Sequence, residues 1–256
     1  MYGSRGMRGF IDLHSHWVAS IDDGARTTDD SVALLRALFS VGFSTVVATP
    51  HMRPGMFDNT AETLRNAYDR TRSALPSGSD LPEVRLASEH FFDAVVFDRI
   101  VADQALPYPS SLPVDKTKGR RSVLVEFPTG RFPTAITHRF FDMMRRKIRP
   151  VIAHPERYEP VWDDPSCLDP LMDAGAVLQL DVAALAGRYG RAPRRAAETL
   201  LQNGYYHCAA SDAHSLKDID PVRQGIELLF SGAGKEEAEF LLIGGPTQII
   251  DGAVVT

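Results

Sequence analysis

The sequence predicts an α/β protein with a single domain, a distorted (β/α)7 barrel of the TIM-like kind. Short apolar runs alternate with helical stretches seven times, in units of roughly 30 to 40 residues, and parallel strands need crossovers of that kind. His, Asp or Glu follows nearly every apolar run. This distribution favours a barrel, whose strands all end around one mouth, over an open doubly wound sheet, whose ligands gather at a switch point.

The first predicted strand covers residues 10–16 and places Asp12, His14 and His16 on one side, because side chains alternate along a strand. Two more carboxylates, Asp22 and Asp23, follow closely. Two imidazoles and an acid on one side suit a divalent metal better than an apolar core. The other predicted strands cover residues 44–51, 84–90, 122–126, 149–154, 176–185 and 205–214.

Helices are predicted between these strands from apolar periodicity and from end signals. Gly42 suits the C-terminal end of the first helix, Asn59 and Glu62 are spaced as a capping box for the second, and Thr134 is predicted to cap the fourth. The predicted helices cover residues 29–41, 60–75, 91–103 in part, 134–147, 166–174, 192–203, 221–230 and 235–242.

The remaining segments are predicted to lack regular structure. The prolines in residues 106–121 indicate an extended loop. Residues 1–8 are predicted to be a disordered extension, and residues 9–256 to form the barrel domain. No change of composition marks a boundary between two domains.

Composition limits the classes of function. A formal net charge of -5 gives no overall basic field, so no nucleic-acid partner is expected. Cys167 and Cys208 are too few for a disulfide scaffold or a thiolate metal cluster, and they suit a reducing cytoplasm. Neither a signal peptide nor a membrane span is recognisable, so a cytoplasmic location is expected.

The polar residues at the ends of the apolar runs predict a catalytic metal site. Imidazole and carboxylate without thiolate suit manganese, iron, zinc or magnesium in an open site. Nine ligands exceed the needs of one ion, so two or three divalent ions are expected, with a bridging carboxylate. The candidate ligands are His14, His16, Asp23, His51, Glu89, Glu126, His154, Asp212 and His214.

Ions clustered about 4 Å apart clamp the attacking and leaving oxygens of an in-line displacement and acidify bound water. The predicted chemistry is therefore phosphoester hydrolysis by a metal-bound hydroxide, without a nucleophilic side chain. Arg157 is the candidate catalytic residue, because its planar guanidinium matches phosphoryl oxygens. An ordinary ion pair at the end of a strand is the alternative role for this arginine.

Seven motifs, IDLHSH, IDDG, TPH, SEH, VEFP, AHPER and SDAH, occur in this order over nearly the whole chain. Together they closely resemble the bacterial protein-tyrosine phosphatases of the polymerase and histidinol phosphatase (PHP) superfamily, the capsule-type manganese-dependent group. The resemblance implies a distorted (β/α)7 barrel with three metals, manganese first among them. It also implies hydrolysis of phosphotyrosine on an autophosphorylating tyrosine kinase that controls polysaccharide assembly.

Carried over by position, the resemblance groups the ligands and gives other residues their roles. His14 and His16 share one metal with Glu126 and Asp212, Asp23 shares another with Glu89 and His214, and His51 and His154 complete the set. Arg157 matches the catalytic arginine. Asp12 is expected to orient an imidazole, and Asp22 to be structural.

The loop sequences differ from those of the family, and some of their residues are candidates for contact with the substrate. Arg53 and Phe57 are candidates for shaping substrate access, and the basic segments at residues 115–121 and 145–149 are candidates for contact with an acidic, tyrosine-rich kinase tail. The sequence is compatible with a homo-oligomer.

Other classes of protein share part of this sequence pattern. A histidinol-phosphate or other small phosphoester phosphatase would differ only in its loops, and a noncatalytic metal-binding scaffold would keep the fold. An amidohydrolase often carries a bridging modified lysine on a middle strand, and the run SVLVEFP has none. A cysteine-dependent phosphatase needs an arginine six positions after its nucleophile, where this chain has Asp173 and His214.

Overall fold

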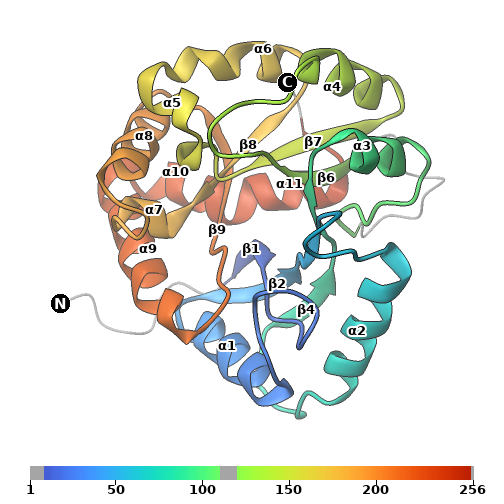
Figure 1. Cartoon of the computed structure of the whole chain (residues 1–256). Helices are drawn as coiled ribbons and strands as arrows, with labels where there is room; N and C mark the ends of the chain where they lie inside the picture. Colours follow the sequence, from blue (N-terminus) through green and yellow to red (C-terminus); the bar gives the residue numbers. More distant parts are fainter. Residues whose placement is uncertain (1–8, 110–119, 255–256) are drawn as a thin grey trace.

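The computed structural model describes residues 9–109 and 120–254, and helices surround the strands at its centre (Figure 1). The extension predicted at residues 1–8 lies outside the described residues, as does most of the predicted loop at 106–121. Of its described residues, 106–109 and Arg120 have no regular structure, as predicted, whereas Arg121 begins a strand. Within the described ranges, no helix is long and apolar enough to cross a membrane.

All seven predicted strand segments form, and two of them are divided. The second consists of β2 (Phe43–Ala48) and β3 (His51–Met52), and the third of β4 (Glu83–Leu86) and β5 (Glu89–Phe91). Pro50 lies in the first break and has no N–H group for a strand ladder. The undivided strands are β1 (Phe10–Ser15), β6 (Arg121–Glu126), β7 (Ile148–Ala153), β8 (Val177–Asp181) and β9 (Tyr206–Ala210).

Parallel pairing joins the strands in two ladders, β1-β2-β4 and β3-β5-β6-β7-β8-β9. The divided strands connect the ladders, since β2 continues into β3 and β4 into β5. A parallel bridge between Ser15 and Ala213 joins β1 to the segment after β9. Backbone hydrogen bonds from Asp212 N to His14 O and from His16 N to Ala213 O, both 2.9 Å, extend this contact. The circuit is closed, and the predicted seven-unit barrel is confirmed.

Helices connect the strands and cover the outside of the barrel (Figure 1). Thr27 caps the first helix in a capping box with Asp30, and Gly42 follows its end at a φ of 117°. The helices are α1 (Thr28–Ser40), α2 (Ala61–Ser73), α3 (Ala94–Val101), α4 (Ile136–Arg145), α5 (Glu159–Asp163), α6 (Asp169–Asp173), α7 (Val182–Leu185), α8 (Arg191–Gln202), α9 (Ile219–Ala233), α10 (Lys235–Glu239) and α11 (Gly245–Asp251).

Of the three apolar clusters among the described residues, the two largest hold these layers together. The larger includes Leu35, Phe140 and Leu200 from the helices and Val46 and Ile152 from the strands. The smaller takes one or more apolar side chains from most strands: Leu13, Val47, Leu124, Val151 and Cys208 are among its members. Side chains supplied by many strands are how a barrel interior is filled.

Several local predictions are wrong. The sixth strand ends at Asp181, because this carboxylate accepts a hydrogen bond from Ala183 N and starts a helix where a longer strand was predicted. The capping box of α2 uses Thr60 and Thr63 in place of Asn59 and Glu62.

The fourth helix also begins differently. Its N-cap is Ala135 in a left-handed conformation, without a side-chain cap, so the prediction for Thr134 is wrong. The sequence did not predict α5 or α11. A π-helical turn at Phe240–Gly244 joins α10 to α11, so the helical run predicted for residues 235–242 continues to Asp251.

Gly225 on α9 supports a test of this packing. A Cβ at this position would lie 1.9 Å from Val182 O, so only glycine lets α9 approach α7 this closely. We expect Gly225→Ala to lower the free energy of unfolding by ~1–3 kcal/mol or more. The matched control is Gly232→Ala on the same helix, where nothing lies within 4 Å of the added Cβ. That variant should be neutral or more stable by about 0.5–1 kcal/mol. Urea denaturation of both variants checks the prediction, and equal stabilities would contradict it.

Candidate metal centre

The candidate metal ligands lie where the strands of the barrel end. Parallel strands bring their carboxyl ends to one face, so the residues that follow them meet there. Asp23 comes from the loop between β1 and α1, and the others come from strand ends. His14 is on β1 and His16 just beyond it, His51 begins β3, Glu89 begins β5, Glu126 ends β6, His154 follows β7, and Asp212 and His214 follow β9.

All nine predicted ligands fall into four overlapping groups, in each of which the potential ligand atoms lie within 4.8 Å of one another. The groups share members, so the structure brings the whole predicted set together at one place. They are His16, Asp23, His51 and His214; His14, His16 and Glu89; His14, His154 and Asp212; and His51, Glu89 and Glu126.

Two buried carboxylates, Glu89 and Asp212, lie at the centre of the cluster. Glu89 Oε2 is 3.0 Å from His51 Nδ1 and 3.3 Å from His14 Nε2, and its Oε1 is 3.2 Å from His154 Nε2. Asp212 Oδ1 is 3.1 Å from His14 Nε2. Each carboxylate therefore touches the ligand atoms of more than one group, as a bridging ligand would.

The cluster strongly perturbs proton affinities. Burial opposes the imidazolium of His14, but the carboxylates of Asp212 and Glu89 outweigh it and raise the pKa. His51 is likewise buried, and Glu89 raises its pKa to about 10. Burial and the charge of Glu89 raise the pKa of Glu126 to about 7. Protons bound by such ligands are released when cations bind, so these shifts mark atoms that suit metal ions.

Unsatisfied buried atoms give a second test of fit. Four atoms of the cluster lack a well-oriented hydrogen bond among the described residues: His51 Nδ1, Glu126 Oε2, His154 Nδ1 and Asp212 Oδ1. Buried polar atoms are nearly always paired, so each needs an explanation. Divalent ions would coordinate atoms of this kind, and the residues present fit such a group.

Two side chains outside the predicted set fix the orientation of the first histidine pair. His16 Nδ1 donates to Asp22 Oδ2 at 2.8 Å, and His14 Nδ1 donates to Gln179 Oε1 at 2.9 Å. Both Nε2 atoms then point into the cluster, 3.2 Å apart. In neutral rings these atoms would present lone pairs to each other, which a shared cation stabilises.

These contacts correct two predictions. Asp12, expected to orient an imidazole, instead accepts hydrogen bonds from the Ser211 hydroxyl at 2.6 Å and the Ser211 N–H at 3.0 Å. Asp22, expected to be merely structural, is the carboxylate that orients His16. Asp12 lies too far back along β1, whereas the loop that carries Asp22 folds over the end of the strand.

Close backbone packing holds that loop. Ala25 N donates to His16 O at 3.0 Å, and a Cβ on Gly24 would lie 1.9 Å from the same oxygen. The amide of Asn59 donates to Ile21 O and His51 O, which ties the loop to β3. Glycine in the IDDG motif is therefore a requirement of close approach.

Two candidate ligands have a left-handed backbone. His154 has a φ of 33° and Asp212 a φ of 47°. Such conformations are unfavourable for residues other than glycine and cluster at functional sites, where surrounding contacts maintain them. At both positions the chain turns sharply at the end of its strand and directs the side chain into the cluster.

Arg157 lies at the edge of the cluster, in the short turn that follows His154. Its Nη1 donates to Asp212 Oδ2 at 2.6 Å, and its guanidinium carbon lies 4.5 Å from the ring centroid of Tyr189. A guanidinium has five N–H donors, so donors remain for phosphoryl oxygens. The sequence reading missed Tyr189, because no motif links it to AHPER and only the fold brings the loop after α7 here.

Glu156, the neighbour of Arg157, is fully buried behind the cluster. Its Oε1 accepts from Asp181 N, and Tyr206 OH donates to its Oε2, both at 2.9 Å. Burial, aided by the charge of Asp181, raises the pKa of Glu156 to about 8. The carboxyl therefore fastens the turn that carries Arg157 to β8 and β9.

The groups differ from those that the resemblance implies. Glu126 lies with His51 and Glu89, and Asp23 with three histidines. Strand pairing explains the position of Glu126: β5 lies between β3 and β6, so Glu89 on β5 lies between His51 on β3 and Glu126 on β6. Of the two candidates for substrate access, Phe57 stacks on His51 with ring centroids 5.2 Å apart, and the Arg53 guanidinium lies 4.0 Å from the Phe91 centroid.

The fold and the cluster define the class of the protein: a parallel α/β barrel with a cluster of histidines and carboxylates at its mouth that could hold divalent metal ions. Residues 10–251 match the model of a family described as capsular polysaccharide synthesis, CpsB/CapC. The chain belongs to this family, which confirms the predicted resemblance to the capsule-type group.

Known relatives cover most of the chain. Tyrosine-protein phosphatase YwqE of Bacillus subtilis is 32% identical over 214 residues, which are 81% of this chain and 78% of YwqE. Tyrosine-protein phosphatase CpsB of Streptococcus pneumoniae is 25% identical over 246 residues, 94% of this chain and 98% of CpsB. A solved structure from the study of these two proteins, described as unique metal-dependent tyrosine phosphatases, aligns with a TM-score of 0.83 at 28% identity and covers 96% of both chains.

Glu156 predicts a dependence of stability on pH. Its pKa is about 8 in the folded protein, and the ordinary value is 4.5. The folded state therefore binds the extra proton between these values, and its stability falls as pH rises from about 4.5 to 8. The free energy of unfolding of Glu156→Gln should equal that of the wild type at pH 5. At pH 8 it should be higher by about 2 kcal/mol or more. Urea titrations of both proteins at several pH values measure the difference, and parallel pH profiles would contradict the prediction.

Proposed function

We propose that this protein hydrolyses phosphotyrosine on a protein substrate, using two or three divalent metal ions held by the nine clustered side chains. The observation that carries the proposal is the overlap of four potential ligand groups around Glu89 and Asp212, with Arg157 at their edge. The names of YwqE and CpsB, and the description of their structures as metal-dependent tyrosine phosphatases, support the choice of reaction.

The cluster residues would hold the ions, and manganese is the first candidate. Bound divalent ions supply Lewis acidity toward phosphoryl oxygens and acidify water. Asp22 and Gln179 keep the Nε2 atoms of His16 and His14 directed at the site. A layout fixed before substrate arrives is what electrostatic catalysis requires.

Arg157 would bind the phosphoryl group. Asp212 and the ring of Tyr189 hold its guanidinium at the edge of the cluster, and 26% of its side chain is exposed to solvent. Its planar fork can match two phosphoryl oxygens and balance the negative charge that spreads over them during transfer. Neither cysteine takes part in this mechanism: burial raises the pKa of Cys208 to about 12, far from a reactive thiolate.

The family match supports a proposal for the physiological setting. The match to a capsular polysaccharide synthesis family supports a substrate within that process, and a cytoplasmic tyrosine kinase with a phosphorylated tail is the proposed one. Of the two basic segments suggested for tail contact, residues 115–119 lie outside the described residues. In the other, Arg149 is buried and donates to Gly175 O and Val254 O, so it is unavailable to a tail.

Metal dependence is the first test. We expect purified protein to contain more than one ion per chain, to lose phosphotyrosine hydrolysis with a chelator and to regain it with manganese. His14→Ala should lower both the metal content and the turnover, because His14 belongs to two of the groups. Elemental analysis and phosphate release measure these effects.

His138→Ala is the matched control, because this histidine is exposed on α4 outside the cluster. Its metal content and turnover should equal those of the wild type. Rapid hydrolysis of histidinol phosphate without hydrolysis of phosphotyrosyl peptides would replace the substrate assignment. Metal binding without any phosphoester hydrolysis would indicate a scaffold.

Tyr189 should act through Arg157. We expect Tyr189→Leu to lower kcat by about 3- to 30-fold, since a cation–π contact is worth ~0.5–2 kcal/mol, with metal content unchanged. Tyr189→Phe keeps the ring and should retain most of the turnover. In an Arg157→Ala background, Tyr189→Leu should have little further effect. Equal loss in both backgrounds, by steady-state kinetics, would show that Tyr189 does not act through Arg157.

A further inference from the structure

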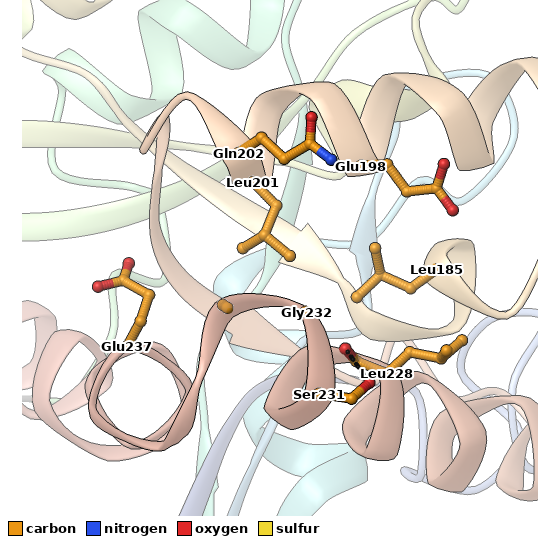
Figure 2. A pocket seen from close by; sticks show the side chains of 9 residues that line it. Leu185, Glu198, Leu201, Gln202, Leu228, Ser231, Gly232 and Glu237 are labelled. Atoms are coloured by element: carbon orange, nitrogen blue, oxygen red, sulfur yellow. Dashed lines mark hydrogen bonds between the residues drawn. The ribbon is translucent and has the colours of Figure 1, made fainter.

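Two grooves stand out on the described surface, and they differ in their relation to the metal centre. The larger, about 520 Å³, lies between α8 and the α9–α10 region and is lined by Leu201, Leu228, Glu198 and Glu237 among others (Figure 2). None of its lining residues belongs to the cluster. The smaller, about 360 Å³, is lined by the last residue of β5 and by residues that come after β5 and β6, two strands that carry candidate ligands.

The smaller groove adjoins the metal centre through the chain itself. Phe91 lies two residues after Glu89, and Pro128 lies two residues after Glu126, so each pair of Cα atoms is within about 7 Å. Phe92 N donates to Glu126 O at 2.8 Å, which joins the two strand ends beneath the groove. A substrate whose phosphate reaches the cluster therefore passes next to this groove.

Aromatic packing preforms the floor of the groove. Phe92 meets Phe127 edge to face at 5.9 Å between ring centroids and Phe140 at 5.4 Å, and Phe127 meets Phe132 at 5.7 Å. Phe92, Phe127 and Phe140 are buried, and half-buried Phe91 and Phe132 line the groove. Rings held on several sides leave little freedom to be lost when a chain segment binds.

The charged side chains around the groove are mainly cationic. Arg131 and Arg139 line it, and Arg53 lies across the ring of Phe91 at one end. In the described part of the chain, neither Arg131 nor Arg139 forms an ion pair with a carboxylate.

Acidic groups near the groove are few or already used. Among the described residues, Asp93 is the only acid that lines it. Its side chain accepts a hydrogen bond from Val96 N and caps α3. Glu159 lies beside Gly130 but outside the lining. The groove therefore offers two guanidinium groups over an apolar, aromatic floor.

We infer that this groove binds acidic residues flanking the phosphotyrosine of the substrate protein, with Arg131 and Arg139 selecting them by charge. An extended chain advances about 3.3 Å per residue, so residues within about three positions of the phosphotyrosine reach the groove. Charge complementarity of this kind acts on selection of the substrate and on its association more than on the chemical step. The inference rests on the proposed phosphotyrosine hydrolysis and names the class of substrate.

The test compares substrates with and without flanking residues. Manganese-loaded protein is assayed with para-nitrophenyl phosphate and with three phosphotyrosyl peptides that have acidic, neutral or basic flanks. The wild type should have its highest kcat/KM on the acidic peptide. Single exposed charge pairs are weak, so both charges are reversed: Arg131→Glu combined with Arg139→Glu should lower kcat/KM on the acidic peptide about 5-fold or more, mainly through KM. The preference should weaken as salt is added.

Arg195→Glu is the matched control, because this exposed arginine lies on α8, outside the groove and outside both basic segments suggested for tail contact. It should leave the peptide preference unchanged. Arg131→Glu alone covers the case in which Arg139→Glu disturbs folding, since Arg131 is exposed and Arg139 packs over Phe97. All variants should hydrolyse para-nitrophenyl phosphate like the wild type.

The outcomes separate the two proposals. Equal kcat/KM on the three peptides, or a preference unchanged by the arginine variants, would overturn the role of the groove and leave phosphotyrosine hydrolysis intact. Failure of the wild type to hydrolyse free phosphotyrosine or any of the peptides would overturn the proposed function itself.

Discussion

The burial of Glu89 and Asp212 among histidines is the interaction on which the site depends. An isolated buried carboxylate is costly, so these two groups are tolerable only where positive charge surrounds them. Each contacts imidazole nitrogens supplied by different strands. The barrel creates that environment, since no single helix or hairpin could bring β1, β3, β7 and β9 to one point. Fold and charge thus constrain each other: the barrel brings the candidate ligands together, and bound cations would offset the cost of burying their carboxylates.

Around the cluster lies a layer of side chains that touch no candidate ion site but fix the groups that do. Gln179 restricts the ring of His14, and Tyr189 packs against Arg157. Glu156 holds the turn that carries Arg157 against β8 and β9. Such partners matter because metal ligands and phosphate-binding groups act only in a narrow range of orientations. Gln179 lies on β8, Tyr189 in the loop after α7 and Glu156 in the turn after β7, so β8 supports the site without contributing a candidate ligand.

How much of this arrangement the sequence could reveal depends on the range of each contact. The strand ends and their ligands were predictable, because an apolar run followed by His, Asp or Glu is a local pattern and parallel strands impose a common end. The side chains that surround and orient these residues were harder to predict from the sequence. Asp12 and Asp22 are both close to His16 in the sequence, and only the fold of the loop at Gly24 decides which carboxylate reaches its ring. Tyr189 is separated from Arg157 by a complete β-α unit, so no local pattern connects them. The predicted start of α2 was wrong for a similar reason. Thr60 and Thr63 form its capping box, because the amide of Asn59 donates hydrogen bonds to Ile21 O and His51 O.

The bridge between Ser15 and Ala213 closes the barrel, so it determines when during folding the candidate metal centre can be completed. The two strands that meet there come from opposite ends of the described chain, and the segment after β9 supplies Asp212 and His214. Contacts between such distant segments form slowly, because a long loop must close before they are gained. During synthesis, the first six strand segments emerge and begin to pack while the mouth of the barrel still lacks two ligands. A chain that stops short of Ala213 would lack this bridge and expose an unclosed edge at β1, so the candidate metal centre is assembled only when the last strand joins the first.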